Sequence, residues 1–421
     1  MRLLLLNVGP IATLASGDVN QPLTGQDMSD VDALCLPRGN GIYVESGIIS
    51  KLDDSEGLSH EFGKQNTDSL TVIDCNGKAI IPGFVDSHTH LLWDGDRADE
   101  MTLRLSGLSY ADIAAQGGGI QKTVNSTRLA TMDRLIQLGG KRIARAAGLG
   151  TTTMECKSGY GLSVDSELKL LEACNRLAIE SQIDIHSTWL GAHDVPKDAT
   201  CDQYVESLIS DQLPKVAEQG LAKYSDVFCE PGWFTLEQTE QIVQAAKEYN
   251  IPSRLHVDEF VDGNGLQLAS DLGAVSGDHV GHSSSQARAS AANTGTMQTF
   301  LPGTPYILGH DLELPLRECV ENQWQFSLAT DFNPNCRSLS IPFVGSLATH
   351  RLGLNPLEAL VAVTRNPATT LISSSEGELA GSLREGGPAD LLILDSNYID
   401  SWCQMPGDNP ISSTIKSGSI V

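Results

Sequence analysis

The segment Pro82-Gly83-Phe84-Val85-Asp86-Ser87-His88-Thr89-His90 decides how the rest of the chain is interpreted. Its apolar run predicts a short buried strand, and two histidines follow at the end of that strand. Side chains two residues apart in extended backbone point to the same side, so His88 and His90 can direct both imidazoles at one point. Two neutral imidazoles at this spacing are typical of half of a Zn²⁺ or Fe²⁺ site. Taken alone, the His-x-His pattern is also compatible with packed or surface histidines.

Short apolar runs alternate with helical patterns between residues 80 and 330. The strand candidates are Ile80–Val85, Gly150–Glu155, Ile183–Leu190, Tyr224–Glu230, Ile251–Val257, Gly273–Val280, Tyr306–Gly309 and Trp324–Thr330. Eight strands, most of them followed by a helix, predict an α/β fold built on a (β/α)8 TIM barrel.

Helix boundaries are marked by local signals. Thr235-Leu236-Glu237-Gln238 is a capping box, and Asn355 before Pro356 is a cap residue followed by a first-turn proline. The pattern also predicts a helix over Arg128–Ala147 that ends at Gly148 in a left-handed conformation.

The two ends of the chain have a different texture from the middle. Residues 1–80 contain short strand candidates at Leu3–Leu6, Gly41–Val44 and Ser69–Asp74, and the apolar run Leu391–Leu394 follows residue 384. We therefore expect residues 1–80 and 384–421 to form one small β domain beside a barrel of residues 81–383.

Ligand-type residues close three more of the predicted strands. His256 lies at the end of the fifth strand, His279 at the end of the sixth and Asp331 at the end of the eighth. The carboxyl ends of parallel barrel strands share one face, where barrel enzymes build their active sites. Together with the His-x-His pair, these residues predict a metal site at that face.

The charge balance excludes some classes of partner. The chain has 421 residues, and 53 Asp and Glu against 28 Lys and Arg give a formal net charge of −25. A surface this acidic repels phosphate backbones and anionic lipid headgroups, so we expect no nucleic-acid or membrane partner. Nine scattered cysteines without a Cys-x-x-Cys pair, and an apolar start that is broken early by Asn7 and Gly9, favour the cytoplasm.

At these strand ends the sequence resembles the amidohydrolase superfamily, whose pattern is His-x-His on strand 1, histidines on strands 5 and 6, and aspartate on strand 8. More narrowly, it is similar to the imidazolonepropionase family in five segments: Leu105–Tyr110, Gly117–Ile120, Lys157–Leu162, Leu190–His193 and Asp331–Pro334. The resemblance implies a TIM barrel, a small β-sandwich from both termini, one divalent metal ion (Zn or Fe) and a homodimer. The implied reaction is hydrolysis of a small anionic cyclic amide, 4-imidazolone-5-propanoate, to N-formimino-L-glutamate.

Roles of single residues also follow from the resemblance. The implied metal ligands are His88, His90, His256 and Asp331. The implied substrate-binding residues are Arg97, Tyr160, His193, Glu259, Asn333, Asn335 and Cys336, and the implied catalytic residues are Glu259, His279 and Asp331. At Asn335 and Cys336 the chain departs from the family, which commonly has glycine followed by a hydroxyl residue there. A thiol is a weaker donor than a hydroxyl, so the contact from Cys336 is in doubt.

The chemistry of these residues agrees with the implied roles. A bound divalent ion brings the pKa of its water to about 7, and a carboxylate must then take a proton while a group protonates the leaving nitrogen. Glu259 and Asp331 are the candidates for these two roles, and the sequence does not divide the roles between them. Glu230 ends the fourth strand, where it could assist a second ion.

Two other functions compete with hydrolysis of a cyclic amide. A metal-dependent deaminase of a purine, pyrimidine or related ring C=N would share the same histidines and aspartate. The substrate tail distinguishes the two enzymes, because a propionate needs a cation such as Arg97. A relative that has kept the barrel and lost the chemistry is the third interpretation, and the intact ligand positions argue against it.

Overall fold

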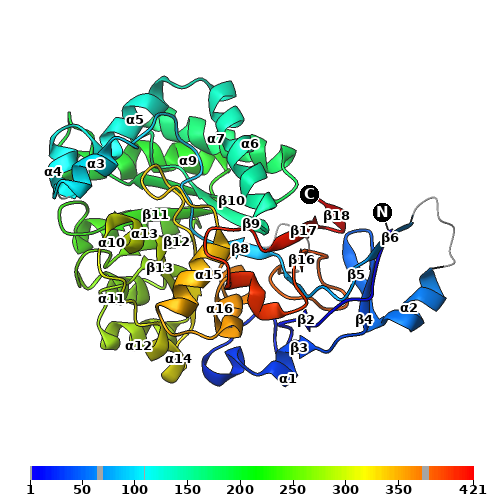
Figure 1. The fold of residues 1–421 in the computed structure, drawn as a ribbon. Coiled ribbons are helices and arrows are strands. Elements are labelled where there is room, and N and C mark those ends of the chain that lie inside the picture. Colours follow the sequence, from blue (N-terminus) through cyan, green and yellow to red (C-terminus); the bar gives the residue numbers. More distant parts are fainter. Residues whose placement is uncertain (1, 64–69, 109, 372–378) are drawn as a thin grey trace.

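The computed structural model describes residues 2–63, 70–108, 110–371 and 379–421, and in these residues an eight-stranded parallel sheet forms the centre (Figure 1). Its strands are β8 (Phe84–Asp86), β9 (Thr151–Lys157), β10 (Asp184–Ala192), β11 (Tyr224–Cys229), β12 (Ser253–Val257), β13 (Ser276–His279), β14 (Met297–Phe300) and β15 (Phe326–Leu328). A parallel bridge between Thr89 and Phe332 joins the ends of the first and last strands. The predicted TIM barrel is confirmed.

The seventh predicted strand was wrong. Strand β14 is Met297–Phe300, and the predicted segment Tyr306–Gly309 lies instead at the end of helix α13 (Gly303–Leu308), with Gly309 as its left-handed cap at φ 76°. Strand β14 escapes a search for apolar runs because it buries Gln298, whose Oε1 accepts a hydrogen bond from buried Arg288 at 3.2 Å.

The first predicted strand spans two different sheets. Strand β7 (Ile80–Pro82) belongs to a sheet of the terminal segments, and β8 begins two residues later in the barrel. Gly83 lies between the two strands, where the chain passes from one sheet to the other. Only glycine fits there, because a Cβ would lie 2.2 Å from Thr152 Oγ1. The segment thus runs from the terminal sheet through β8 of the barrel, and His88 and His90 follow β8 at the barrel mouth.

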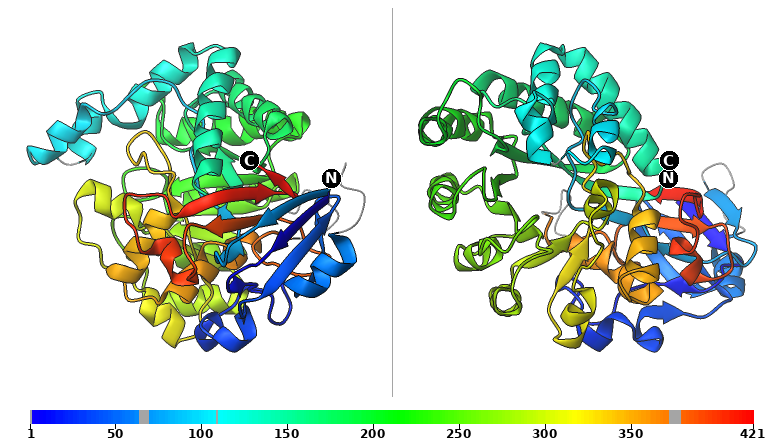
Figure 2. Two further views of the ribbon diagram at one scale, coloured as in Figure 1. Left: turned by 45° about the vertical axis from the view of Figure 1, so that its right-hand side comes forward. Right: turned by 60° about the vertical axis from the view of Figure 1, so that its left-hand side comes forward.

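Helices surround the barrel (Figure 2). Those described between β8 and the end of the barrel are α3 (Glu100–Leu105), α4 (Tyr110–Ala115), α5 (Gly119–Leu129), α6 (Met132–Gly148), α7 (Val164–Glu180), α8 (Cys201–Ser207), α9 (Leu213–Gln219), α10 (Leu236–Glu248), α11 (Gly265–Asp271), α12 (Ser285–Thr294), α13, α14 (Leu316–Glu321), α15 (Ile341–His350), α16 (Pro356–Ala362) and α17 (Arg365–Ala368). The left view of Figure 2 shows α3 and α4 extending outward from the barrel. No helix in the described residues is both long and apolar enough to cross a membrane.

The predicted capping box at Thr235 and the predicted cap residue Asn355 before Pro356 are confirmed. The helix predicted over Arg128–Ala147 was wrong at both ends. Helix α6 begins at Met132 because the Thr131 hydroxyl accepts a hydrogen bond from Arg134 N at 3.2 Å, and Arg128 belongs to α5. Gly148 is the last helical residue, and Gly150 is the glycine with positive φ, at 94°.

The terminal segments form two further sheets beside the barrel. One has the order β5-β4-β1-β6, formed by β1 (Arg2–Leu6), β4 (Asn40–Glu45), β5 (Ile48–Asp54) and β6 (Leu70–Asp74). The other has the order β18-β17-β16-β7-β2-β3, formed by β2 (Ile11–Ala12), β3 (Cys35–Leu36), β7, β16 (Leu391–Leu394), β17 (Ile411–Lys416) and β18 (Ser419–Ile420). The short helices α1 (Val31–Leu34) and α2 (Ser55–Phe62) connect their strands.

The two terminal sheets share one apolar core. Leu3 and Ile42 of the first sheet pack with Ile80, Leu391 and Ile415 of the second, which makes the small β-sandwich. The strands predicted at the two ends of the chain are therefore seen, although Ser69 lies outside the described residues. The division of the chain into 1–80 with 384–421 and 81–383 stays a prediction.

Candidate active site

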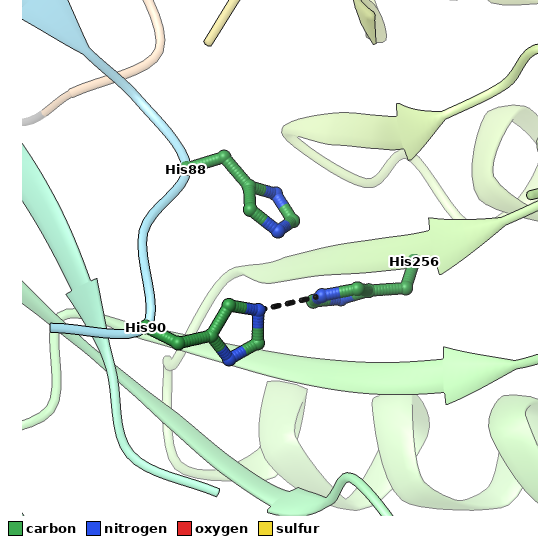
Figure 3. A group of neighbouring side chains, drawn as sticks. All are labelled: His88, His90 and His256. Carbon is green, nitrogen blue, oxygen red and sulfur yellow. Dashed lines mark hydrogen bonds between the residues drawn. The ribbon is translucent and has the colours of Figure 1, made fainter. Parts of the chain in front are cut away.

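The ligand-type residues predicted at the strand ends meet at one mouth of the barrel. His88 and His90 follow β8, His256 lies in β12, His279 ends β13, and Asp331 follows β15. All of them are buried. Figure 3 shows His88 and His90 on the segment after β8 facing His256 across the barrel, with Nε2 of His90 and Nε2 of His256 3.3 Å apart.

The donor atoms fit a divalent metal ion. Two groups of candidate ligands stand out among the described residues, His88 with His90 and His256, and His88 with His279 and Asp331. Two nitrogens bound at about 2.0–2.1 Å in tetrahedral geometry lie ~3.3–3.4 Å apart, which agrees with the His90–His256 separation. Asp331 Oδ1 lies 3.6 Å from Nε2 of both His88 and His90.

Two of these donor atoms are buried without a protein partner. Within the described part of the chain, His88 Nε2 and Asp331 Oδ1 have no hydrogen bond. An unsatisfied buried polar atom costs about 1–3 kcal/mol, so a bound cation would relieve both atoms at once. Burial also holds the pKa of His88, His90 and His279 well below the usual value, and a neutral imidazole is the form that binds metal.

Two aspartates that the sequence interpretation missed orient the histidines. Asp278 Oδ2 accepts a hydrogen bond from His88 Nδ1 at 2.7 Å, and Asp226 Oδ1 accepts one from His256 Nδ1 at 3.1 Å. With Nδ1 as donor, each ring presents the lone pair of Nε2 to the centre of the site. The available signal was a charged residue inside strands that were predicted to be buried.

The backbone is strained where the strands end. His279, Asp331, Asp258 and Val280 all have positive φ, between 48° and 75°. Non-glycine residues rarely adopt this conformation, and such strain is concentrated at functional sites. Here the positive φ values change the direction of the backbone where β12, β13 and β15 end at the barrel mouth.

One pocket contains most of the predicted site residues. It is lined by His90, Arg97, Ile120, Tyr160, His193, Phe228, His256, Glu259, Phe260, His279, Thr304, Leu308, Asp331, Asn333 and Asn335. A second cavity of about 450 Å³ shares Glu259, Phe260, His279, Thr304 and Leu308 with it. The two cavities therefore adjoin on the side of β13 and α13.

Arg97 is a buried cation on the wall of this pocket. Its Nε donates a hydrogen bond to Glu100 Oε2 at 2.9 Å, and its Nη2 lies 2.8 Å from the same oxygen in an ion pair. Glu100 Oε1 accepts from Gly119 N at 2.9 Å. Glu100 thus fixes both the guanidinium and the start of α5. The glycine run before α5 packs closely, since a Cβ on Gly118 would lie 2.7 Å from Ile113.

His193 and Tyr160 form an aromatic wall beside the metal-ligand candidates. The His193 ring stacks on His90 with centroids 4.9 Å apart, and Tyr160 lies 5.1 Å from His193. His193 Nδ1 is 2.9 Å from the carbonyl of Gly159, so Nδ1 carries the proton and Nε2 is the acceptor. Burial lowers the pKa of His193 to about 3, which keeps the ring neutral.

Glu259 is a carboxyl group in the pocket that neither candidate ligand group includes. Its Oε2 lies 3.6 Å from His279 Nε2. Burial, and then the nearby Asp331 and Glu230, raise its pKa well above the usual value. Glu230 lies behind it and accepts a hydrogen bond from the Glu259 backbone nitrogen. Glu230 is also outside both ligand groups, and the assistance to a second ion considered for it stays a prediction.

The loop after Asp331 holds the remaining predicted residues. Asn333 Oδ1 accepts hydrogen bonds from the backbone nitrogens of Asn335 and Cys336, so this side-chain oxygen stabilises the turn of the loop. Asn335 Oδ1 accepts from Arg104 Nη1 of α3 at 2.5 Å. The Cys336 thiol is buried and donates to the carbonyl of Thr330 at 3.7 Å. Cys336 is not among the residues that line the pocket. A substrate contact from Cys336 stays a prediction.

The barrel, its β-sandwich and the histidine–aspartate mouth define an amidohydrolase-type enzyme. Solved structures with this fold include atrazine chlorohydrolase of Arthrobacter aurescens complexed with zinc and atraton (16% identity, TM-score 0.72, 99% of this chain and 94% of that one). Another is 5-methylcytosine deaminase of Klebsiella pneumoniae (17% identity, TM-score 0.70, 100% and 98%). No family model matches the chain.

Relatives identify the family within this class. The imidazolonepropionase of Symbiobacterium thermophilum is 40% identical over 424 aligned residues, covering 100% of this chain and 97% of the relative. That of Halobacterium salinarum is 36% identical over 393 residues, covering 92% and 93%. The chain belongs to the imidazolonepropionase family.

Proposed function

We propose that the protein hydrolyses the cyclic amide of 4-imidazolone-5-propanoate to N-formimino-L-glutamate. The observation that carries this proposal is a single buried pocket that places the Arg97 cation together with the histidine–aspartate cluster. A cation that can hold a carboxylate and a cluster that can hold a metal ion are what a small anionic cyclic amide requires. The family relatives support the same reaction.

We further propose that His88, His90, His256 and Asp331 hold one divalent ion, Zn or Fe. When bound, such an ion lowers the pKa of a coordinated water to about 7 and polarises a carbonyl oxygen. Arg97 binds the propionate, with Tyr160 and His193 enclosing the ring. Asn333 and Asn335, which line the pocket, contact the substrate from the loop after Asp331, and a contact from Cys336 of the same loop stays a prediction.

Hydrolysis of the ring amide forms a bond from water oxygen to the carbonyl carbon and breaks the carbon–nitrogen bond. Water gives up a proton, and the leaving nitrogen gains one. Glu259 and Asp331 are the carboxyl groups in reach, and the raised pKa of Glu259 favours it as the group that carries a proton to nitrogen. His279, neutral and 3.6 Å from Glu259, donates a hydrogen bond toward the developing negative charge on oxygen.

An assay with the metal-loaded protein tests the proposal. Zinc- and iron-loaded samples are mixed with 4-imidazolone-5-propanoate, and the absorbance of the ring is followed. We expect the absorbance to disappear with turnover in at least one sample. Absence of turnover in both, together with ammonia release from a purine or pyrimidine, would establish the deaminase alternative instead. The likeness to a deaminase structure at 17% identity concerns the fold.

Substitution of Arg97 tests how the substrate tail is held. Arg97→Met removes a charged hydrogen-bond donor worth about 1.5–3 kcal/mol, so KM should rise ~10–100-fold with kcat nearly unchanged. Metal content, measured by elemental analysis, should stay at the parent level. Arg134→Met, which removes an exposed arginine paired with Asp94, is the matched control and should leave KM unchanged. An unaltered KM in Arg97→Met would show that the propionate binds elsewhere.

The setting of the enzyme is also proposed. We propose a homodimer in the cytoplasm, without nucleic-acid or membrane partners. The formal charge of −25 supports the last two points, since it opposes association with anionic polymers and headgroups.

A further inference from the structure

A buried lysine lies beneath the metal-ligand candidates, in the interior of the barrel. Lys157 Nζ lies 2.7 Å from Asp226 Oδ2, 3.1 Å from Glu155 Oε1 and 3.8 Å from Asp278 Oδ2. All four side chains have no exposed surface. They come from β9, β11 and β13, which are alternate strands of the barrel.

Each of the three carboxylates that meet at Lys157 holds a different part of the ligand set. Asp226 accepts from His256 Nδ1, and Asp278 accepts from His88 Nδ1. Glu155 Oε2 accepts from the backbone nitrogen of Thr89 at 3.1 Å, between His88 and His90. The Thr89 hydroxyl donates a hydrogen bond to the backbone carbonyl of Glu155 at 2.6 Å. The backbone nitrogen of Lys157 donates one to the carbonyl of Thr89 at 2.9 Å.

A charged layer at this depth needs an explanation. Barrel interiors are usually filled by branched apolar side chains, and burying an ion pair is rarely favourable for stability. Three carboxylates this close also repel each other strongly in a dry interior. A cation at their common centre is what allows all three to keep their positions beneath the histidines.

We propose that Lys157 is a positioning residue: its ammonium group holds Asp226, Asp278 and Glu155 in place, and these in turn fix the ring orientations of His256 and His88 and the backbone between His88 and His90. This inference rests on the proposed metal centre. Without the ammonium, the carboxylates separate and the two rings lose the partners that direct Nε2 to the centre. Metal affinity then falls, although Lys157 itself is not a ligand.

The test measures Zn²⁺ affinity by competition with a chromogenic chelator. Lys157→Met should raise the Kd for Zn²⁺ ~10–100-fold, the range seen when partners of metal-binding histidines are removed. A second readout is the ¹⁵N NMR spectrum of the histidine rings without metal. The parent should show His88 and His256 protonated at Nδ1, and the variant should show mixed tautomers. With saturating Zn²⁺, the KM of the substrate should match the parent, because Arg97 is untouched.

Lys416 supplies a matched control. It is another buried lysine, and its Nζ lies 2.7 Å from Asp184 Oδ2 and 2.6 Å from Asp390 Oδ2, where β17 of the sandwich meets β10. Lys416→Met should lower the Tm as Lys157→Met does and leave the Kd for Zn²⁺ and the tautomers unchanged. If Lys157→Met does not fold, Lys157→Gln keeps a donor for one carboxylate without the charge and should still weaken Zn²⁺ binding.

The outcomes separate the inference from the proposal beneath it. Simple Coulomb repulsion predicts the opposite change, because loss of a nearby positive charge would tighten Zn²⁺ binding. Tighter or unchanged binding in both Lys157 variants would overturn the positioning role and leave the metal centre standing. A parent protein that binds no Zn²⁺ would contradict the metal centre and this inference together.

Discussion

Asp331→Asn is expected to lower kcat/KM by about 10³-fold or more and to reduce the bound metal. The carboxylate offers a buried oxygen, Oδ1, 3.6 Å from Nε2 of both His88 and His90, and an amide is a poorer ligand for a divalent cation. Metal ions contribute several kcal/mol to transition-state stabilisation, and each 1.36 kcal/mol corresponds to tenfold in rate. Elemental analysis and steady-state kinetics on the same sample measure both effects.

A variant that loses a buried carboxylate elsewhere provides the comparison. Asp390→Asn changes an aspartate of the sandwich that pairs with Lys416 at 2.6 Å, and it should keep parent metal content and kcat. Removal of metal from the parent by a chelator should reproduce the loss seen in Asp331→Asn, and added Zn²⁺ or Fe²⁺ should restore activity. Full activity in a metal-free sample would contradict the assignment of this site as a metal centre.

Glu259→Gln is expected to reduce kcat by ~10²–10⁴-fold, the usual contribution of a positioned general acid or base. Glutamine keeps the size of the side chain, but its amide cannot take up and release a proton as a carboxyl group does. Because Glu259 is outside both candidate ligand groups, the metal content should change little. Single-turnover kinetics at saturating substrate measure the effect.

The matched control for this variant is Glu237→Gln, an exposed carboxyl in the first turn of α10. It should behave as the parent. Loss of metal from Glu259→Gln would mean that Glu259 is a ligand, and parent-like kcat would assign the proton transfers to another group, with Asp331 the remaining carboxyl candidate.

The sequence was sufficient for the parts of the site that repeat a barrel rule. His256, His279 and Asp331 could be placed together because each ends a predicted strand, and parallel barrel strands end at one face. The His-x-His pair follows from the period of two in extended backbone. These positions depend only on where each strand ends and on which side of the strand a residue points, and local sequence patterns specify both.

Other parts could not be predicted because they depend on contacts between distant strands. The link between Lys157, Asp226 and Asp278 joins β9, β11 and β13, and each residue alone looks like an ordinary charge in a strand. Strand β14 was missed for a related reason, since the partner that makes burial of Gln298 acceptable is Arg288 of α12. The position of Glu100 against Arg97 likewise needs the fold of the loop.

Identification of the reaction product tests the central claim most directly. The metal-loaded protein is incubated with 4-imidazolone-5-propanoate, the product is identified by mass spectrometry and NMR, and ammonia is assayed in the same mixture. The expected product is N-formimino-L-glutamate, formed by addition of one water molecule, with no ammonia released. Release of ammonia with the ring still closed, or an unchanged substrate in the presence of fully loaded protein, would contradict it.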